Sequence, residues 1–366
     1  MRRTPALIVG GGPAGAAAAI VLARAGAPHL LVERSRETGD ALCGGFLSWR
    51  TLAELQRLGV DEAALGPARV TRVRVLTATR VAEARLPRPA LGVSRYRLDT
   101  VMLDRARALG AAVERGVAVR SIAGGVRTDD GATIEHDALF LASGKHDVRG
   151  LARPAAARGD DPALGLRLRL AASPTLDRLV GDAVELHLFD RGYAGAVRQE
   201  DGSVNLCLAV RRSRLRMAGD SAALLRAIGD ELPALGDRLG HLDSPIIDAV
   251  ANVPYGWRTT AGPAGLFRLG DQAGVIPSLA GEGLAIAITS GSDAARAYVR
   301  GGAAAAPNWQ ASFRTALRRP IGLAAIIRGV AERPALATPM VAAVSRAPAL
   351  LRLMALATRT RVARRD

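Results

Sequence analysis

The stretch ALIVGGGPAG, which runs from Ala6 to Gly15, decides the fold. Its basic start at Met1–Arg3 and its small, apolar residues are also typical of a secretory signal. Three consecutive glycines and a proline, however, interrupt any continuous apolar helix. We therefore interpret the stretch as a short strand over Ala6–Val9, a glycine turn and a helix from about Pro13 to Ala25.

The glycine turn fits the pattern G-x-G-x-x-G. In this pattern Gly10 permits a tight turn, Gly12 lets the backbone approach a pyrophosphate, and Gly15 lets the helix pack close to the strand. Pro13 and Ala14 begin the helix, whose N-terminus faces the phosphates. The turn therefore predicts a dinucleotide-binding site.

A second apolar strand, His29–Val32, supports this prediction. It is followed by Glu33 and Arg34, and Glu33 stands 23 residues after Gly10. At that spacing a carboxylate meets the hydroxyl pair of a ribose. Strand, turn, helix, strand and acid in this order indicate a Rossmann-like domain, without distinguishing NAD from FAD.

A segment about 240 residues later favours FAD. Leu266–Gly270 is an expected strand that ends at Asp271, a residue suited to binding a polyol chain. A loop with Pro277 then leads to a helix that begins near Gly281-Glu282-Gly283. The N-terminus of this helix would stabilise negative charge on a reduced flavin ring.

At these positions the chain resembles the superfamily of FAD-dependent monooxygenases and geranylgeranyl reductases, the p-hydroxybenzoate hydroxylase-like flavoproteins. The resemblance covers about residues 4–300, and the segments that carry it are Gly10–Gly15 with Glu33, Arg95–Asp99 and Gly270-Asp271. The stretch Tyr255–Gly283 also resembles flavin oxidoreductases associated with type III polyketide synthases, and of the superfamily it is these that the sequence resembles most.

The resemblance implies roles for single residues. Glu33 would bind the adenosine ribose, Arg95 would lie near the FAD phosphates or ribityl chain, Val119 would offer its backbone to adenine, and Asp271 would hold the ribityl chain. The complete predicted cofactor site is Gly10, Gly12, Pro13, Ala14, Gly15, Glu33, Arg34, Cys43, Gly44, Arg95, Val119, Gly144, Asp271, Pro277, Gly281, Glu282 and Gly283. No metal site is predicted.

One segment departs from the family. In the aromatic hydroxylases an Asp-Gly pair near this position serves FAD and NAD(P)H, whereas here Ser143 replaces the acid and Gly144 remains. Lys145 and His146 are candidates for recognising a phosphate or an anionic substrate. A solvated basic turn is the alternative.

A second segment, Asp40–Ser48, resembles the cysteine-glycine segment of prenyl reductases, where a cysteine lies beside the flavin. By that likeness Cys43 is a candidate catalytic acid or gate, and Gly44 a neighbour of the cofactor. A small residue packed near the cofactor is the alternative for Cys43. Against a reductase, the stretch around Gly192–Ala196 lacks the Trp and Phe-Pro of that family's substrate motif.

Between the FAD segments the pattern changes to period two, as in Leu164–Leu170, which predicts an antiparallel sheet. The resemblance implies that this sheet lies over the flavin. On this sheet His187 is a candidate to meet a phenol proton, with a structural histidine as the alternative. Tyr193 and Trp257 are candidates to line an apolar pocket, with packing in the core as the alternative. The predicted α/β fold has a Rossmann-like FAD-binding domain of the GR2 type (1–150 and 262–300), an inserted substrate domain of antiparallel sheet (151–261) and C-terminal helices (301–366).

Composition excludes other classes of protein. The formal net charge is +16, yet aromatic residues are only 3%, which disfavours a nucleic-acid binder. The two cysteines suit a reducing cytoplasm. The apolar run Ala349–Ala357 precedes Arg359, Arg361, Arg364 and Arg365, so the C-terminus either contacts an anionic membrane peripherally or packs on the catalytic body. The oligomeric state is left open.

Three functions compete. The first is an FAD-dependent monooxygenase of secondary metabolism that uses NAD(P)H and a flavin C4a-hydroperoxide to hydroxylate a hydrophobic aromatic or polyketide-derived small molecule. The second is an FAD-dependent ene-reductase of isoprenoid-like double bonds. The third is a non-catalytic protein that binds flavin or lipid.

Overall fold

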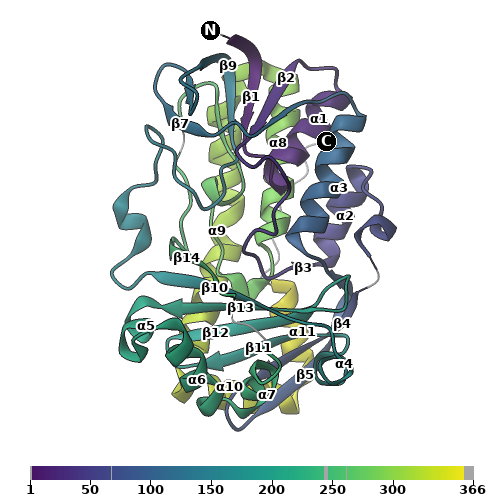
Figure 1. Cartoon of the computed structure of the whole chain (residues 1–366), viewed down its shortest axis with the longest axis vertical. Coiled ribbons are helices and arrows are strands. Elements are labelled where there is room, and N and C mark those ends of the chain that lie inside the picture. The colour runs from purple at the N-terminus through teal and green to yellow at the C-terminus, as the bar shows by residue number, and fades with distance from the viewer. Residues whose placement is uncertain (1, 67, 243–245, 261, 358–366) are drawn as a thin grey trace.

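The computed structural model describes residues 2–66, 68–242, 246–260 and 262–357, and it contains two β-sheets at opposite ends of the long axis (Figure 1). The chain passes between them more than once. The first sheet is built around the glycine turn, and the second is covered by the C-terminal helices. This division matches the α/β fold that the sequence predicts.

The first sheet is mainly parallel. β1 pairs with β2 and β9 in parallel, and β15 extends the parallel part beyond β9. The order of its strands is β6 (Ala112–Arg115), β2 (His29–Glu33), β1 (Arg2–Val9), β9 (Thr133–Leu141), β8 (Val126–Thr128) and β7 (Val119–Ile122), with β15 (Leu266–Arg268) paired to β9. Strands far apart in sequence therefore end at one edge.

Helices α1 (Pro13–Arg24), α3 (Arg95–Ala108) and α8 (Gly283–Gly301) pack together beside this sheet. α1 and α8 approach so closely that a Cβ on Gly291 would lie 2.0 Å from the backbone oxygen of Ala14. The core beneath them is apolar and includes a parallel stack of Phe140 on Phe267, with ring centroids 4.7 Å apart. Burial of this core is the main source of the sheet's stability.

The second sheet is larger than the predicted range 151–261. Its order is β14 (Asp248–Val253), β10 (Ala163–Leu170), β13 (Val204–Arg211), β12 (Gly192–Arg198), β11 (Ala183–Phe189), β4 (Arg69–Leu76), β5 (Val81–Gly92) and β3 (Phe46–Leu47). β3, β4 and β5 come from within residues 1–150. The sheet is antiparallel except where β4 runs parallel to β11. In β4 the buried Val73 and Val75 alternate with Arg72 and Arg74, which suits a half-buried sheet, and an irregularity in the pairing with β5 between Val70 and Arg72 lets Val70 be buried as well.

Helices cover both faces of the second sheet. On one face lie α4 (Pro174–Val180), α6 (Ser221–Glu231) and α7 (Pro233–Leu239), and on the other lie α9 (Ala306–Ala331), α10 (Pro334–Arg346) and α11 (Pro348–Ala357). The remaining helices are α2 (Trp49–Arg57) and α5 (Arg212–Ala218), with single 3-10 turns at 62–65, 155–158, 270–272, 278–280 and 302–305.

The predicted helical C-terminus is confirmed as far as residue 357. The basic end with Arg359, Arg361, Arg364 and Arg365 lies outside the described residues. Within the described part of the chain, no single helix has the length and apolar composition needed to cross a membrane.

Candidate active site

The glycine turn between β1 and α1 has no room for side chains. Gly10 has a φ of +106°, and a Cβ there would lie 2.5 Å from the oxygen of Ala142. A Cβ on Gly15 would lie 1.9 Å from the oxygen of Gly10. Gly12 precedes α1 and supplies no side-chain cap, so the first N–H groups of the helix stay available to an anion. The turn fits the pyrophosphate of a dinucleotide.

Glu33 lies directly beside this turn. Its carboxylate accepts hydrogen bonds from the backbone N–H of Gly11 at 2.7 Å and of Ser35 at 2.9 Å. The Glu33 backbone oxygen accepts from Val117, two residues before Val119 in β7. The end of β2 with Glu33 therefore lies beside the segment that leads into β7. Arg34 is more peripheral, with a hydrogen bond to His146 at 3.0 Å.

Arg95 faces the turn from the start of α3. Its Nη2 lies 3.3 Å from where a Gly12 Cβ would stand, and Nε and Nη2 donate to Asp99 at 2.8 and 2.6 Å. Burial opposes the charge of the guanidinium, but Asp99, Cys43 and Asp271 favour it, and together they raise the pKa of Arg95. A permanent cation therefore stands where the phosphates or ribityl chain would lie.

Asp271 lies in the short turn after β15. Its Oδ2 is 3.5 Å from Nζ of Lys145, and its backbone oxygen accepts a hydrogen bond from Arg153 at 3.0 Å. The next residue, Gln272, donates to the backbone oxygen of Gly144 at 2.9 Å. The divergent segment 143–146 is thus bound to the turn that carries Asp271, and Lys145 contributes a positive charge at the predicted ribityl position.

The loop before α8 lies at the other end of the predicted flavin position. Gly281 has a φ of +63°, and a Cβ there would lie 2.9 Å from the ring of Phe46. Glu282 is fully buried, and its Oε1 accepts a hydrogen bond from Ser48 at 2.9 Å. This bond ties the loop to the start of α2. Pro277 immediately precedes the 3-10 turn at 278–280, and Gly283 begins α8.

Cys43 is half-buried, and its backbone is fixed from the second sheet. The Cys43 oxygen accepts hydrogen bonds from Asn205 at 2.9 Å and from the Cys207 thiol at 3.0 Å. Burial and the neighbouring Cys43 raise the pKa of Cys207 to about 12. Cys207 is therefore a protonated thiol that donates, and the two cysteines of the chain lie together.

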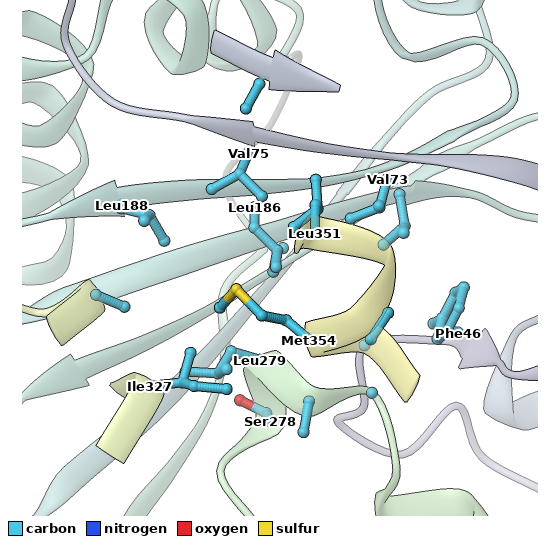
Figure 2. Close-up of a pocket in the computed structure, with 18 of the residues that line it drawn as sticks. Phe46, Val73, Val75, Leu186, Leu188, Ser278, Leu279, Ile327, Leu351 and Met354 are labelled. Carbon is cyan, nitrogen blue, oxygen red and sulfur yellow. The ribbon is translucent and has the colours of Figure 1, made fainter. Parts of the chain in front are cut away.

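An apolar cavity of about 150 Å³ lies between the second sheet, the loop before α8 and the C-terminal helices. Figure 2 shows Val73, Val75 and Leu186 on the sheet side, with Leu351 and Met354 pointing in from α11. Gly44 and Gly281 also line it, so the cavity reaches the loops predicted to contact the flavin. Apart from one serine, its lining side chains are apolar.

That serine, Ser278, belongs to a chain of hydroxyl groups. Its Oγ lies 2.7 Å from the hydroxyl of Tyr193 and 2.9 Å from that of Tyr255. The N–H of Leu279 donates to Tyr193 Oη at 3.3 Å. Burial raises the pKa of both tyrosines, so both remain neutral hydrogen-bond donors. Tyr193 thus supports the cavity through Ser278, behind the residues that line it.

The position of His187 corrects the expectation that it meets a substrate proton. Leu186 and Leu188 line the cavity, and His187 between them on β11 points to the opposite face of the sheet. There it is fully buried, with Nε2 3.1 Å from Glu185 Oε2. Glu185 also accepts two hydrogen bonds from Arg238. His187 is a structural histidine in a buried charged cluster.

The sequence alone does not identify Ser278, Tyr255, Leu351 or Met354 as site residues. Ser278 follows Asp271 by seven residues, and its one signal is that it is a polar residue in an otherwise apolar loop. The α11 residues gave no such signal, because their apolar pattern is equally typical of packing.

Part of the chain matches a known protein family. Residues 3–149 match the family described as FAD binding domain. A curated relative, menaquinone reductase of Mycolicibacterium smegmatis, is 27% identical over 324 residues, which cover 82% of this chain and 77% of the relative. Fold, site and family match define an FAD-dependent oxidoreductase, an enzyme that has the fold of the flavoprotein monooxygenases.

Solved structures extend the fold over nearly the whole chain. PqsL of Pseudomonas aeruginosa, in complex with 2-aminobenzoylacetate, superposes with a TM-score of 0.72 at 17% identity, covering 92% of this chain and 99% of its own. A geranylgeranyl bacteriochlorophyll reductase-like protein from Thermoplasma acidophilum gives 0.73 at 18% identity, covering 99% and 94%. Monooxygenases and reductases therefore share this architecture, and the fold alone does not choose between them.

Proposed function

We propose that this oxidoreductase is a monooxygenase that hydroxylates a hydrophobic aromatic substrate, phenolic or polyketide-derived, with NAD(P)H as its reductant. The observation that carries the proposal is the apolar cavity with a single hydroxyl, Ser278, between the sheet and the predicted flavin loops. Such a cavity accepts a molecule that is apolar except for one polar group.

The hydrogen bonds around Ser278 determine which polar group fits. The N–H of Leu279 donates to Tyr193 Oη, and the hydroxyls of Tyr193 and Ser278 share a hydrogen bond in which either can be the donor. In the proposed arrangement Tyr193 donates to Ser278 Oγ. When Tyr255 also donates to Ser278, both lone pairs of the serine are occupied and its own proton is directed into the cavity. An oxygen acceptor, such as a phenolate or carbonyl, is the matching partner. Stabilising a phenolate would activate the ring for attack.

The residues around the glycine turn fit FAD, because the turn would be filled by any Cβ at Gly10 or Gly15. Glu33 would hold the adenosine ribose, Arg95 the phosphates, and Asp271 with Lys145 the ribityl chain. When bound, FAD supplies the redox and oxygen-transfer chemistry. The chain itself fixes the substrate against Ser278 and keeps bulk water out of the apolar cavity.

A second candidate is an ene-reductase of isoprenoid-like double bonds. It is favoured by the position of Cys43, next to Gly44 at the cavity, and by the relationship to a menaquinone reductase. The apolar lining would accept an isoprenoid chain as readily as an aromatic ring. Ser278 disfavours a pure hydrocarbon substrate, which offers no oxygen acceptor, but it suits a quinone carbonyl as well as a phenolate. The two candidates are therefore distinguished by whether turnover requires oxygen.

The deciding experiment compares turnover with and without oxygen. FAD-loaded enzyme with NAD(P)H is offered a long-chain phenol in air, and a prenyl lipid under anaerobic conditions. If the enzyme is a monooxygenase, it should hydroxylate the phenol only when oxygen is present, and the Cys43→Ala variant should retain this activity. Anaerobic saturation of the prenyl lipid that is abolished by Cys43→Ala, with no phenol product in air, would establish the reductase instead.

A further inference from the structure

Helix α11 is apolar except for Arg352 and yet largely exposed. Of its ten residues, Leu351 is buried, Met354 and Ala355 are half-buried, and the other seven are exposed. Leu350, Leu353 and Leu356 expose 47%, 58% and 45% of their surface. Spaced by three residues, these leucines form one outward row. An apolar helix of this kind in a water-soluble protein is normally covered on all sides.

The inner side of the same helix forms a wall of the substrate cavity. Leu351, Met354 and Ala355 line the cavity, so the outward leucine row lies one helix thickness from the cavity interior (Figure 2). Two further C-terminal helices also expose an apolar side chain, Ile326 on α9 and Leu336 on α10.

The surroundings of α11 are strongly basic. Arg352, which is exposed on α11, lines a groove of about 1650 Å³ between α2, α8, α9 and α11. The charged side chains of this groove are two carboxylates and six guanidinium groups, namely Glu54, Asp293, Arg50, Arg57, Arg88, Arg296, Arg300 and Arg352. Arg57 pairs with Glu54 and Arg296 with Asp293, which leaves a clear positive excess beside the leucine row.

Charge and shape together select the occupant. A second copy of this chain would bring a like-charged groove against the first, which disfavours self-association. Anionic phospholipids satisfy both features, because their phosphates match the arginines and their acyl chains match the leucines. α10 and α11 together are apolar enough for a membrane segment but are bent by 113°, a shape suited to lying along a surface.

We propose that α11 docks the enzyme on an anionic lipid bilayer, with Leu350, Leu353 and Leu356 in the acyl region and Arg88 and Arg352 at the phosphates. This surface places the apolar cavity against the bilayer, from which a hydrophobic substrate would enter past α11. The entry route rests on the proposed function, whereas the docking surface does not.

The test uses the FAD-loaded full chain and needs no turnover. Co-sedimentation is measured with vesicles of phosphatidylcholine, with and without phosphatidylglycerol. The native chain is expected to bind the phosphatidylglycerol vesicles more tightly, and added salt should weaken this preference. The triple variant L350Q/L353Q/L356Q should lose at least about ten-fold in affinity, because the apolar contribution is removed. R88A/R352A should lose the preference for phosphatidylglycerol.

M217Q/I246Q is the matched control, because both side chains are exposed and apolar but lie outside the C-terminal helices. It should bind vesicles as the native chain does. The proposal is overturned if the native chain binds neither kind of vesicle, or if the leucine variant binds like the native chain. It is also overturned if the leucine variant only converts a dimer into a monomer in sedimentation. If the chain binds vesicles but hydroxylates no substrate, the docking surface is supported and the proposed function is contradicted.

Discussion

The hydroxyl of Tyr193 lies 2.7 Å from Ser278 Oγ and so joins the second sheet to the loop before α8. Tyr193 comes from β12, whereas Ser278 follows the turn of Asp271 at the edge of the first sheet. This one contact couples the wall of the apolar cavity to the predicted flavin site. It also gives the cavity its polar group.

Removing that group tests the role of Ser278. Ser278→Ala should lower kcat/KM for a phenolic substrate roughly 10- to 100-fold, the cost of one hydrogen bond to a charged acceptor. FAD content and thermal stability should change little. Steady-state kinetics measures the effect, and Ser345→Ala, which alters an exposed serine on α10, is the control. If kcat/KM is unchanged in Ser278→Ala, the serine does not bind the substrate.

Asp271→Ala should weaken FAD binding by about ten-fold or more, because a carboxylate hydrogen bond is lost and Lys145 is left without this partner. Titration of the apoprotein with FAD measures the dissociation constant. Asp237→Ala, at an exposed position on α7, should bind FAD normally. Equal affinity in the two variants contradicts the placement of the ribityl chain.

Gly15→Ala should yield protein with little flavin and a lower Tm. The added methyl would lie 1.9 Å from the Gly10 oxygen, so the turn and the start of α1 must separate. Gly39→Ala meets no atom within 4 Å and serves as the control. Flavin absorbance per polypeptide and thermal unfolding report the result. A fully flavin-loaded Gly15→Ala variant would show that the turn does not bind the pyrophosphate.

The charged cluster on the far face of the second sheet predicts an acid-sensitive fold. Burial opposes ionisation of Glu185, but hydrogen bonds from His187 and Arg238 lower its pKa from 4.5 to about 2. A carboxyl whose pKa is lower in the folded chain stabilises the fold above its unfolded pKa. This stabilisation, of the order of 3 kcal/mol, is lost as pH falls from about 4.5 towards 2.

Urea unfolding of the native chain and of Glu185→Gln across that range measures this contribution. The variant should be less stable near neutral pH and less sensitive to acid. His187→Leu should likewise lower stability while turnover per bound flavin stays within about two-fold, because the histidine faces away from the cavity. A His187→Leu variant that is as stable as the native chain but has no turnover would show that His187 has a catalytic role after all.

The cofactor site could be predicted from sequence because it depends on local rules. Gly10 is required by its φ of +106°, Gly15 by its contact with Gly10 within the same turn, and Glu33 follows at a fixed spacing. The face on which His187 lies could not be predicted, because alternation along β11 does not reveal which side of the sheet holds the cavity. β4 was missed for a related reason, since its partner β11 is more than 100 residues away.

The cavity itself depends on tertiary packing. Leu351 and Met354 on α11 have the same apolar character as the exposed Leu350 and Leu353, and only the folded chain separates the cavity wall from the outward row. Ser278 is recognisable as a site residue only once Tyr193 and Tyr255 are brought to it.

Oxygen labelling tests the central claim most directly. FAD-loaded enzyme is reduced anaerobically, given a long-chain phenol and then exposed to ¹⁸O₂, and the product is weighed by mass spectrometry. A monooxygenase predicts one ¹⁸O atom in each product molecule. Reoxidation of the flavin with no labelled product from any hydrophobic phenol, alongside saturation of a prenyl lipid without air, would contradict it.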